Sequence, residues 1–172
     1  MSAEQRESVA AYQEGAAFPY LGKAYTLEVR QYLSYKRPGV MLEGDQLVVL
    51  TARKDSGVIE AAVKEWYLEQ AKRVVSKRVR FYQNRMQEQV ESIRIKDVKS
   101  RWGSCSSKRN LNFNWRLVMA PMEVLDYVVV HELCHLREMN HSKAFWNLVE
   151  EILPDYRKSR EWLKECRLIE RY

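Results

Sequence analysis

The sequence predicts a single domain of the α+β class, and three observations lead to that prediction. Apolar and polar residues alternate in two separate regions, 20–52 and 110–117, as they do in strands that bury one face. Between those regions, the segment 56–91 repeats apolar residues every three or four positions, which is the period of a helix. The chain of 172 residues is long enough for one ordinary core and too short for two independent domains.

The N-terminal part divides into a leader, a group of strands and a long helical segment. Residues 1–17 are expected to form a polar leader, and 18–172 the single domain. Within 18–55, apolar residues alternate with polar ones on either side of the Gly44-Asp45 turn, which predicts a small meander of strands. The segment 56–91 contains no proline, so a long helix or a pair of helices that acts as a scaffold is expected there.

The C-terminal part, 92–172, is expected to begin with strands and to end with helices. In NLNFNWRL, four apolar residues alternate with asparagine and arginine, which predicts an antiparallel strand with one buried face. Pro121 suits the first turn of a helix that continues through LDYVVVHELCHL. A further amphipathic helix should end at Pro154, and DYRKSREWLKECRLIE should form the last helix.

Composition excludes several classes of protein. No apolar run is long enough to span a membrane, and MSAEQRESVAAYQEG lacks the apolar segment of a secretory signal. The three cysteines are irregularly spaced, which argues against a disulfide framework and for a reducing compartment. A cytoplasmic protein with no membrane partner is therefore expected, and no pattern in the sequence indicates its oligomeric state.

The chain carries a positive charge of +6, from 29 Lys and Arg against 23 Asp and Glu. Much of the excess lies in KRVVSKRVR and around RKSR, where a solvated helix face is the simpler interpretation. No motif with interleaved aromatic residues accompanies these runs. Binding to nucleic acid is therefore only weakly supported.

All three histidines of the chain lie in HELCHLREMNH, from His131 to His141. On a helix, His131 and His135 project from the same face one turn apart, so both imidazoles can bind one ion. Glu132 lies beside them without having to bind the metal. This is the H-E-x-x-H arrangement, in which two histidines hold zinc and the glutamate acts as general base.

His141 can be the third ligand only if the chain turns back after the helix, because ten helical residues would carry it about 15 Å along the axis. Asn140 tolerates the left-handed conformation that such a turn often needs, and Ser142 can cap the next helix. The offsets of four and ten also occur in metzincins, but Glu138 replaces the glycine of that signature, so the chain is not assigned to that group.

Three neutral imidazoles leave one position of a single zinc ion open for water, as in catalytic sites. The sequence therefore predicts hydrolysis of peptide bonds by a metal-bound water that Glu132 activates. Cys134 points away from His135 on the helix and is interpreted as a buried apolar thiol.

The run RWGSCSSKRNLNFNWRLVMAPMEVLDYVVVHELCHLREMNHSKAFW closely resembles the YgjP-like metallopeptidase domain, a group similar to the SprT-like zincin proteases. The likeness is strong over about 95–165, and LGKAYTLEV with the long helix fits more loosely. The resemblance implies a zincin-like fold, with a small, twisted, mainly antiparallel sheet beside an active-site helix. It implies that 92–172 is the catalytic core, with His131, His135 and His141 as zinc ligands and Glu132 as base.

In zincins an edge strand above the metal pairs with the substrate backbone, and the resemblance offers RWGSC or NLNFN for that strand. Trp102, Gly103 and Ser104 are candidates for lining the cleft, although a core tryptophan and a bulge glycine explain the first two equally well. Tyr156 or Arg157 is a candidate donor to the developing oxyanion.

Two alternative functions are kept open. In the first, zinc only stabilises a binding module, which would need a fourth protein ligand such as Cys105 or Cys166. In the second, the protein is a DNA-associated protease of the SprT-like type, which the positive charge and the resemblance favour. The expected partner in the main hypothesis is a peptide or protein substrate.

Overall fold

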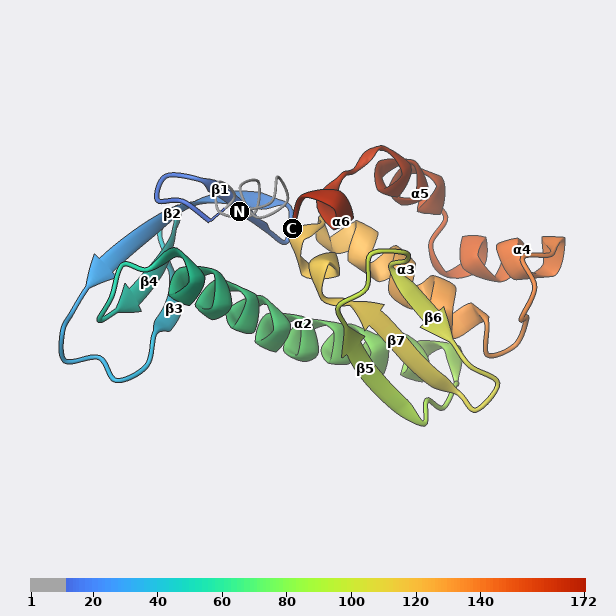
Figure 1. Cartoon of the computed structure of the whole chain (residues 1–172). Coiled ribbons are helices and arrows are strands. Elements are labelled where there is room, and N and C mark those ends of the chain that lie inside the picture. Colours follow the sequence, from blue (N-terminus) through green and yellow to red (C-terminus); the bar gives the residue numbers. More distant parts are fainter. Residues whose placement is uncertain (1–11) are drawn as a thin grey trace.

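The computed structural model describes residues 12–172 and contains two sheets joined by one long helix, α2 (Figure 1). The α+β class is confirmed. The first sheet has the order β1-β2-β4-β3 and the second the order β5-β7-β6. The strands are β1 (Ala17–Tyr20), β2 (Lys23–Gln31), β3 (Gly39–Glu43), β4 (Gln46–Thr51), β5 (Ser92–Lys96), β6 (Gly103–Cys105) and β7 (Asn110–Asn114).

The first sheet is not the meander that was expected for 18–55. β2 pairs with β4 in parallel, from Thr26 with Gln46 to Gln31 with Thr51. β3 and β4 form an antiparallel hairpin around Gly44, which has a φ of +57°. The connection 32–38 is long enough to place β3 beyond β4, so β4 inserts between β2 and β3.

The prediction of a polar leader over 1–17 falls mostly on residues 1–11, which lie outside the described residues. The described end of that segment belongs to the core. Tyr12 is only 4% exposed and its ring lies 5.3 Å from that of Phe18, centroid to centroid. Ala17 already begins β1.

Helix α2 (Ser56–Met86) connects the two sheets. Its 31 residues correspond to a length of about 46 Å. The Asp55 side chain caps it by accepting a hydrogen bond from the backbone amide of Val58, at 3.1 Å. The helix ends earlier than the predicted 91 because Gln87 adopts a left-handed conformation with a φ of +54°. Its N-terminal half contacts the first sheet, and its C-terminal half contacts β5 and the next helix of the core.

The second sheet is mixed. β7 is the central strand and pairs in parallel with β5 and antiparallel with β6, so the expected antiparallel character holds for one pairing only. The strand expected to run to residue 117 stops at Asn114, whose side chain accepts a hydrogen bond from the amide of Arg116 at 3.0 Å. That contact starts a 3₁₀ helix, η1 (Trp115–Met119).

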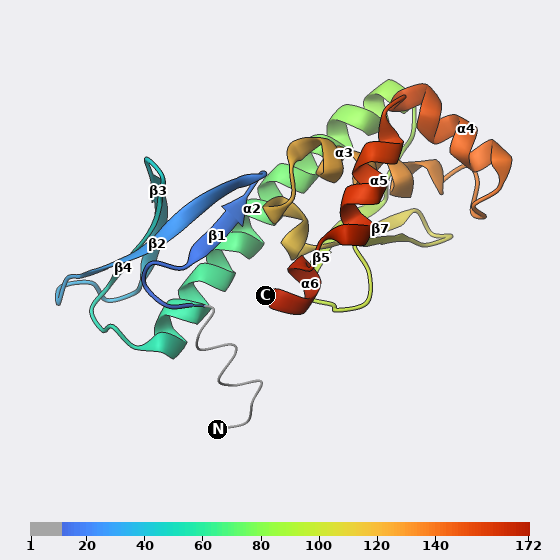
Figure 2. The ribbon, with the colours of Figure 1, turned by 90° about the horizontal axis from the view of Figure 1, so that it is seen from above.

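Four helices follow η1 in the sequence, and they are α3 (Met122–Cys134), α4 (Lys143–Ile152), α5 (Tyr156–Glu165) and α6 (Leu168–Arg171). Helices α4 and α5 lie on either side of the end of α3, whereas α6 lies near η1 (Figure 2). The single last helix expected over 155–170 is divided in two, because Cys166 is extended (φ −76°, ψ 146°). Among residues 12–172, no helix combines the length and the hydropathy that crossing a bilayer requires.

A charged contact fixes how α3 lies against α2. Both nitrogens of the Arg78 fork donate to the Asp126 carboxylate, at 2.6 and 2.7 Å, and the Tyr82 hydroxyl donates to the same group at 3.1 Å. Asp126 is only 8% exposed, and these donors satisfy its buried oxygens. Because Asp126 lies on the same helix as His131, this contact also sets the direction in which the histidine face of α3 points.

Candidate metal centre

The structure brings the three histidines together. The Nε2 atom of His141 lies 3.0 Å from Nε2 of His131 and 3.1 Å from Nε2 of His135. His131 is on α3, His135 follows the last residue of that helix, and His141 precedes α4. One ligand atom from each ring lies within 4.8 Å of the others. The three rings therefore converge on one point, as the sequence predicts.

The chain turns back between His135 and His141 without a left-handed residue. Non-glycine residues with positive φ are, within 12–172, only Leu21, Gln87 and Arg109, so the role expected for Asn140 is wrong. The turn instead extends the hydrogen-bonding of the helix end, because the amides of Arg137 and Glu138 both donate to the carbonyl of Cys134.

Two anchors hold this turn. The expected cap is present at its far end, where the Ser142 hydroxyl accepts from the amide of Phe145 at 3.3 Å. At its near end, Arg137 binds the carboxylate of Glu88, just beyond α2, and also donates to the carbonyl of Met86. Burial alone would raise the pKa of Glu88, but Arg137 and Arg109 outweigh it and hold the pKa below its usual range.

Hydrogen bonds orient the rings for binding a metal through Nε2. A carbonyl oxygen only accepts, so Nδ1 of His135 must carry the proton that it donates to the Glu138 carbonyl at 2.9 Å. This leaves a lone pair on Nε2 of His135. The Tyr127 hydroxyl lies 3.4 Å from Nδ1 of His131, so that ring also has its hydrogen-bond partner at Nδ1.

The electrostatic environment favours the neutral form of His131 and His135. Burial lowers the pKa of His131 to about 3, and the neighbouring His135, His141 and Arg160 add to the effect. Burial also lowers the pKa of His135, which His141 reinforces and the Glu138 carbonyl opposes. Zinc bound tetrahedrally at about 2.0–2.1 Å needs nitrogens roughly 3.3 Å apart. The observed separations and the neutral donors therefore fit a divalent metal ion.

Aromatic rings from α4 pack against the cluster. Phe145, with no exposed surface, stacks on His135 at 4.5 Å, and Trp146 stacks on His141 at 5.9 Å. Phe145 appeared in the sequence only as an apolar residue of an amphipathic helix, and Trp146 gave no separate signal. The contact of Tyr127 could have been inferred from its position four residues before His131 on the same helix.

Glu132 lies on the edge-strand side of the cluster. It is 5% exposed, and burial raises its pKa to about 8 against the opposing charge of Arg101. Its carboxylate is packed against Gly103, where an added Cβ would lie 2.8 Å from Oε1. Only glycine at this position leaves the carboxylate in its present place.

The two candidate substrate strands occupy different positions in the sheet. RWGSC contains β6, the edge strand next to α3, whereas NLNFN is β7, which is paired on both sides and has no free edge. Trp102 directly precedes β6, and Gly103 faces Glu132. Ser104 lies on the opposite face, where its hydroxyl accepts from the Asn112 amide at 3.2 Å.

Tyr156 and Arg157, the two candidate oxyanion donors, have different environments. Tyr156 is buried and stacks between Trp146 and Tyr127, with ring centroids 5.4 and 6.1 Å away. Arg157 is exposed and binds Glu150 at 2.6 Å. Arg160, one turn later on α5, lies over the Trp146 ring at 4.5 Å and is the cation of this helix that influences His131.

No cysteine joins the histidines. The potential metal cluster found within residues 12–172 consists of the three histidines alone. Cys134 is fully buried, as expected, and the thiol of Cys166 donates to the carbonyl of Leu163. Cys105 lies on β6, where its thiol donates to the carbonyl of Ser106. The described residues thus do not supply the fourth ligand that a structural zinc site needs.

The chain is similar to one known protein family and to two known proteins. The model of the family described as the YgjP-like metallopeptidase domain matches residues 1–166. A stretch of 53 residues is 42% identical to the UTP pyrophosphatase of Escherichia coli (strain K12), and it spans 28% of this chain and 32% of that relative. The crystal structure of the metallopeptidase zymogen abylysin of Pyrococcus abyssi is 24% identical, with a TM-score of 0.41 over 58% of this chain and 90% of that one. The chain belongs to the YgjP-like metallopeptidase domain family.

Proposed function

We propose that the protein is a zinc-dependent metallopeptidase that hydrolyses peptide bonds, with one zinc ion held by His131, His135 and His141. The observation that carries the proposal is the convergence of the three imidazoles beside the buried carboxylate of Glu132, with Nε2 of His141 3.0 and 3.1 Å from Nε2 of His131 and His135. Membership of a metallopeptidase family supports it. Glu132 is the general base.

When bound, zinc would supply an acidified water and an electrophile for the scissile carbonyl. The protein's own residues provide the rest of the chemistry. Glu132 accepts a proton on its carboxylate, and burial favours its protonated form, so the proton is retained for transfer to the leaving amine. Gly103 holds the carboxylate in place by contact.

The substrate would bind as an extended strand along β6. This strand is at the edge of its sheet, so one side of its backbone has no strand partner among the described residues. Main-chain hydrogen bonds to that edge would hold a peptide without demanding particular side chains. Peptides and unfolded proteins are therefore the substrate class that we propose.

Replacing Glu132 with Gln tests this function. The variant keeps the three imidazoles but loses the base, so we expect unchanged zinc content and hydrolysis slower by about 10²–10⁴-fold. Glu161→Gln, an exposed glutamate on α5 with 59% of its side chain accessible, is the matched control and should cleave like the wild type. Zinc content by elemental analysis and cleavage of an unfolded protein provide the two readouts. Equal cleavage by wild type and Glu132→Gln would exclude the role of Glu132.

A second candidate is the hydrolysis of a phosphoanhydride bond in UTP at the same centre. The relative named UTP pyrophosphatase favours it, with 42% identity over 53 residues, although the match covers only 32% of that protein. A divalent ion and a general base serve phosphoryl transfer as well as acyl transfer. Pyrophosphate release from UTP by the wild type, and its loss in Glu132→Gln, is the test.

The DNA-associated alternative has a separate test. Its physical basis is the net charge of +6. If DNA phosphates bind the protein, the affinity must fall steeply between low and high salt. Binding that is absent, or that does not respond to salt, removes this alternative.

A further inference from the structure

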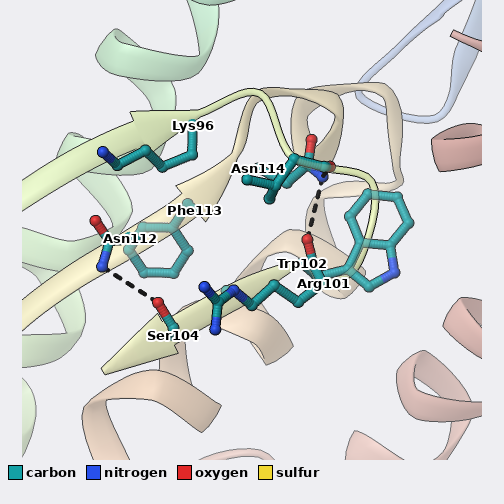
Figure 3. A pocket seen from close by; sticks show the side chains of 9 residues that line it. Lys96, Arg101, Trp102, Ser104, Asn112, Phe113 and Asn114 are labelled. Atoms are coloured by element: carbon teal, nitrogen blue, oxygen red, sulfur yellow. Dashed lines mark hydrogen bonds between the residues drawn. The ribbon is translucent and has the colours of Figure 1, made fainter. Parts of the chain in front are cut away.

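A pocket of about 340 Å³ lies on the second sheet, beside β6 and β7 (Figure 3). The alternation along β7 explains its polar lining, because Leu111 and Phe113 enter the core while the asparagines between and after them face outward. The volume lies within the range of small-molecule sites. The lining side chains used below are Lys96, Arg101, Trp102, Ser104 and Asn112.

The pocket is positively charged. Its lining residues include Lys96 and Arg101 and no acidic residue. Within residues 12–172, neither cation forms an ion pair. Asp97, the only acid between 92 and 114, instead binds Arg116 at 2.7 Å. Two cations that form no ion pair at a concave site favour an anionic ligand.

Hydrogen bonds pre-organise the pocket. The Asn114 amide donates to the carbonyls of Val98 and Arg101, at 2.6 and 3.1 Å, and so fixes the loop that precedes β6. The Ser104 hydroxyl accepts from Asn112, which leaves its own proton free to donate to a ligand. In Figure 3, Arg101 extends toward Ser104 and Asn112, and Trp102 lies at the other end of the pocket.

The pocket is adjacent to the metal centre through β6. Gly103 lines the pocket and also touches Glu132. A ligand held by Arg101 therefore lies across a single strand from the proposed base.

We propose that this pocket binds a nucleoside triphosphate, with Lys96 and Arg101 contacting the phosphates and Trp102 stacking on the base. Phosphate oxygens match the two cations and the hydroxyl donor, and an indole ring suits any base. A nucleic acid strand fits less well, because its successive phosphates need a continuous basic groove and these cations share one bounded pocket. The choice of ligand rests on the second candidate function, the hydrolysis of UTP.

Binding of UTP to the full-length Glu132→Gln protein tests this site without turnover. Isothermal titration should show that Lys96→Ala and Arg101→Ala each raise the Kd for UTP by about 10- to 100-fold, the loss expected for a charge-assisted hydrogen bond. Lys77→Ala is the matched control, since it removes one positive charge from α2, outside this pocket, and should change the Kd less than twofold. UTP should quench tryptophan fluorescence, and Trp102→Phe should remove the quenching while binding persists.

Three results would overturn the site. The first is an unchanged Kd in both pocket variants, and the second is an equal loss in Lys77→Ala, which would indicate unspecific attraction. The third is tighter binding of a single-stranded oligonucleotide than of UTP. If UTP binds through Lys96 and Arg101 but the wild type does not hydrolyse it, the pocket stands and the second candidate function fails. If the wild type hydrolyses UTP with the same KM in both pocket variants, the function stands and the pocket fails.

Discussion

Gly103→Ala should damage catalysis while leaving the metal ligands untouched. A Cβ at this position would lie 2.8 Å from Oε1 and 2.9 Å from Cγ of Glu132, whereas ordinary contact begins at 3.4 Å. Glu132 or β6 must therefore shift by about 0.6 Å. A displacement of about 1 Å can slow an enzyme by about 100-fold, so we expect kcat/KM to fall by about 10- to 100-fold.

The assay compares hydrolysis, zinc content and urea unfolding of the same preparations. We expect a loss of about 1–3 kcal/mol in the free energy of unfolding from the added methyl group, and the same zinc content as the wild type. Gly39→Ala is the matched control, because a Cβ there meets no atom within 4 Å. A Gly103→Ala protein that cleaves substrate at the wild-type rate would refute the reasoning that Gly103 positions the carboxylate.

Three further predictions follow from contacts around the centre. Tyr127→Phe removes the hydroxyl 3.4 Å from Nδ1 of His131, so zinc affinity measured by chelator competition should fall about 10-fold; an unchanged affinity would show that the contact is incidental. Glu88→Gln leaves Arg137 and Arg109 without their carboxylate and should cost about 1–3 kcal/mol of unfolding free energy at pH 7, since both arginines are partly exposed. The folded-state pKa of Glu88 is lowered, so its contribution to the unfolding free energy is present above the unfolded-state pKa of about 4.3. That contribution is lost as the pH falls through the folded-state pKa, so the stabilities of wild type and variant should converge in acid. A stability difference that stays constant with pH would contradict this prediction. Chelation should stop hydrolysis but keep the far-ultraviolet circular dichroism spectrum, with activity restored by zinc, whereas loss of the spectrum would favour a structural metal.

The histidine cluster could be predicted from sequence because local geometry determines most of it. A spacing of four residues on a helix places His131 and His135 together whatever surrounds them. The return of His141 required only a turn within ten residues. The cause of that turn could not be predicted, since it depends on Glu88 and Arg137, which are 49 residues apart.

The strand pairings could not be predicted in the same way. Alternation along 110–117 correctly indicates buried Leu111 and Phe113, but it continues past Asn114, where a side-chain cap ends the strand. The insertion of β4 between β2 and β3 has no local signal, because the apolar pattern of a strand does not specify its neighbour. The positions of the strands were therefore predicted better than the strands with which they pair.

The buried contacts that position Glu132 could not be predicted from the sequence either. Gly103 was a candidate for the cleft, but its close packing against the carboxylate depends on how α3 lies beside β6. The position of α3 also depends on the contact of Arg78 with Asp126, which links residues 48 positions apart. The arginine showed in the sequence only as part of a basic run.

The length of α2 restricts how this protein can vary. One residue inserted into a helix turns everything beyond it by about 100° and advances it by about 1.5 Å. Because α2 packs on the first sheet at one end and on α3 and β5 at the other, a single insertion would rotate one packed face out of register with the other. Natural length changes should therefore gather in connections such as 32–38, while the count of residues between Asp55 and Gln87 stays constant.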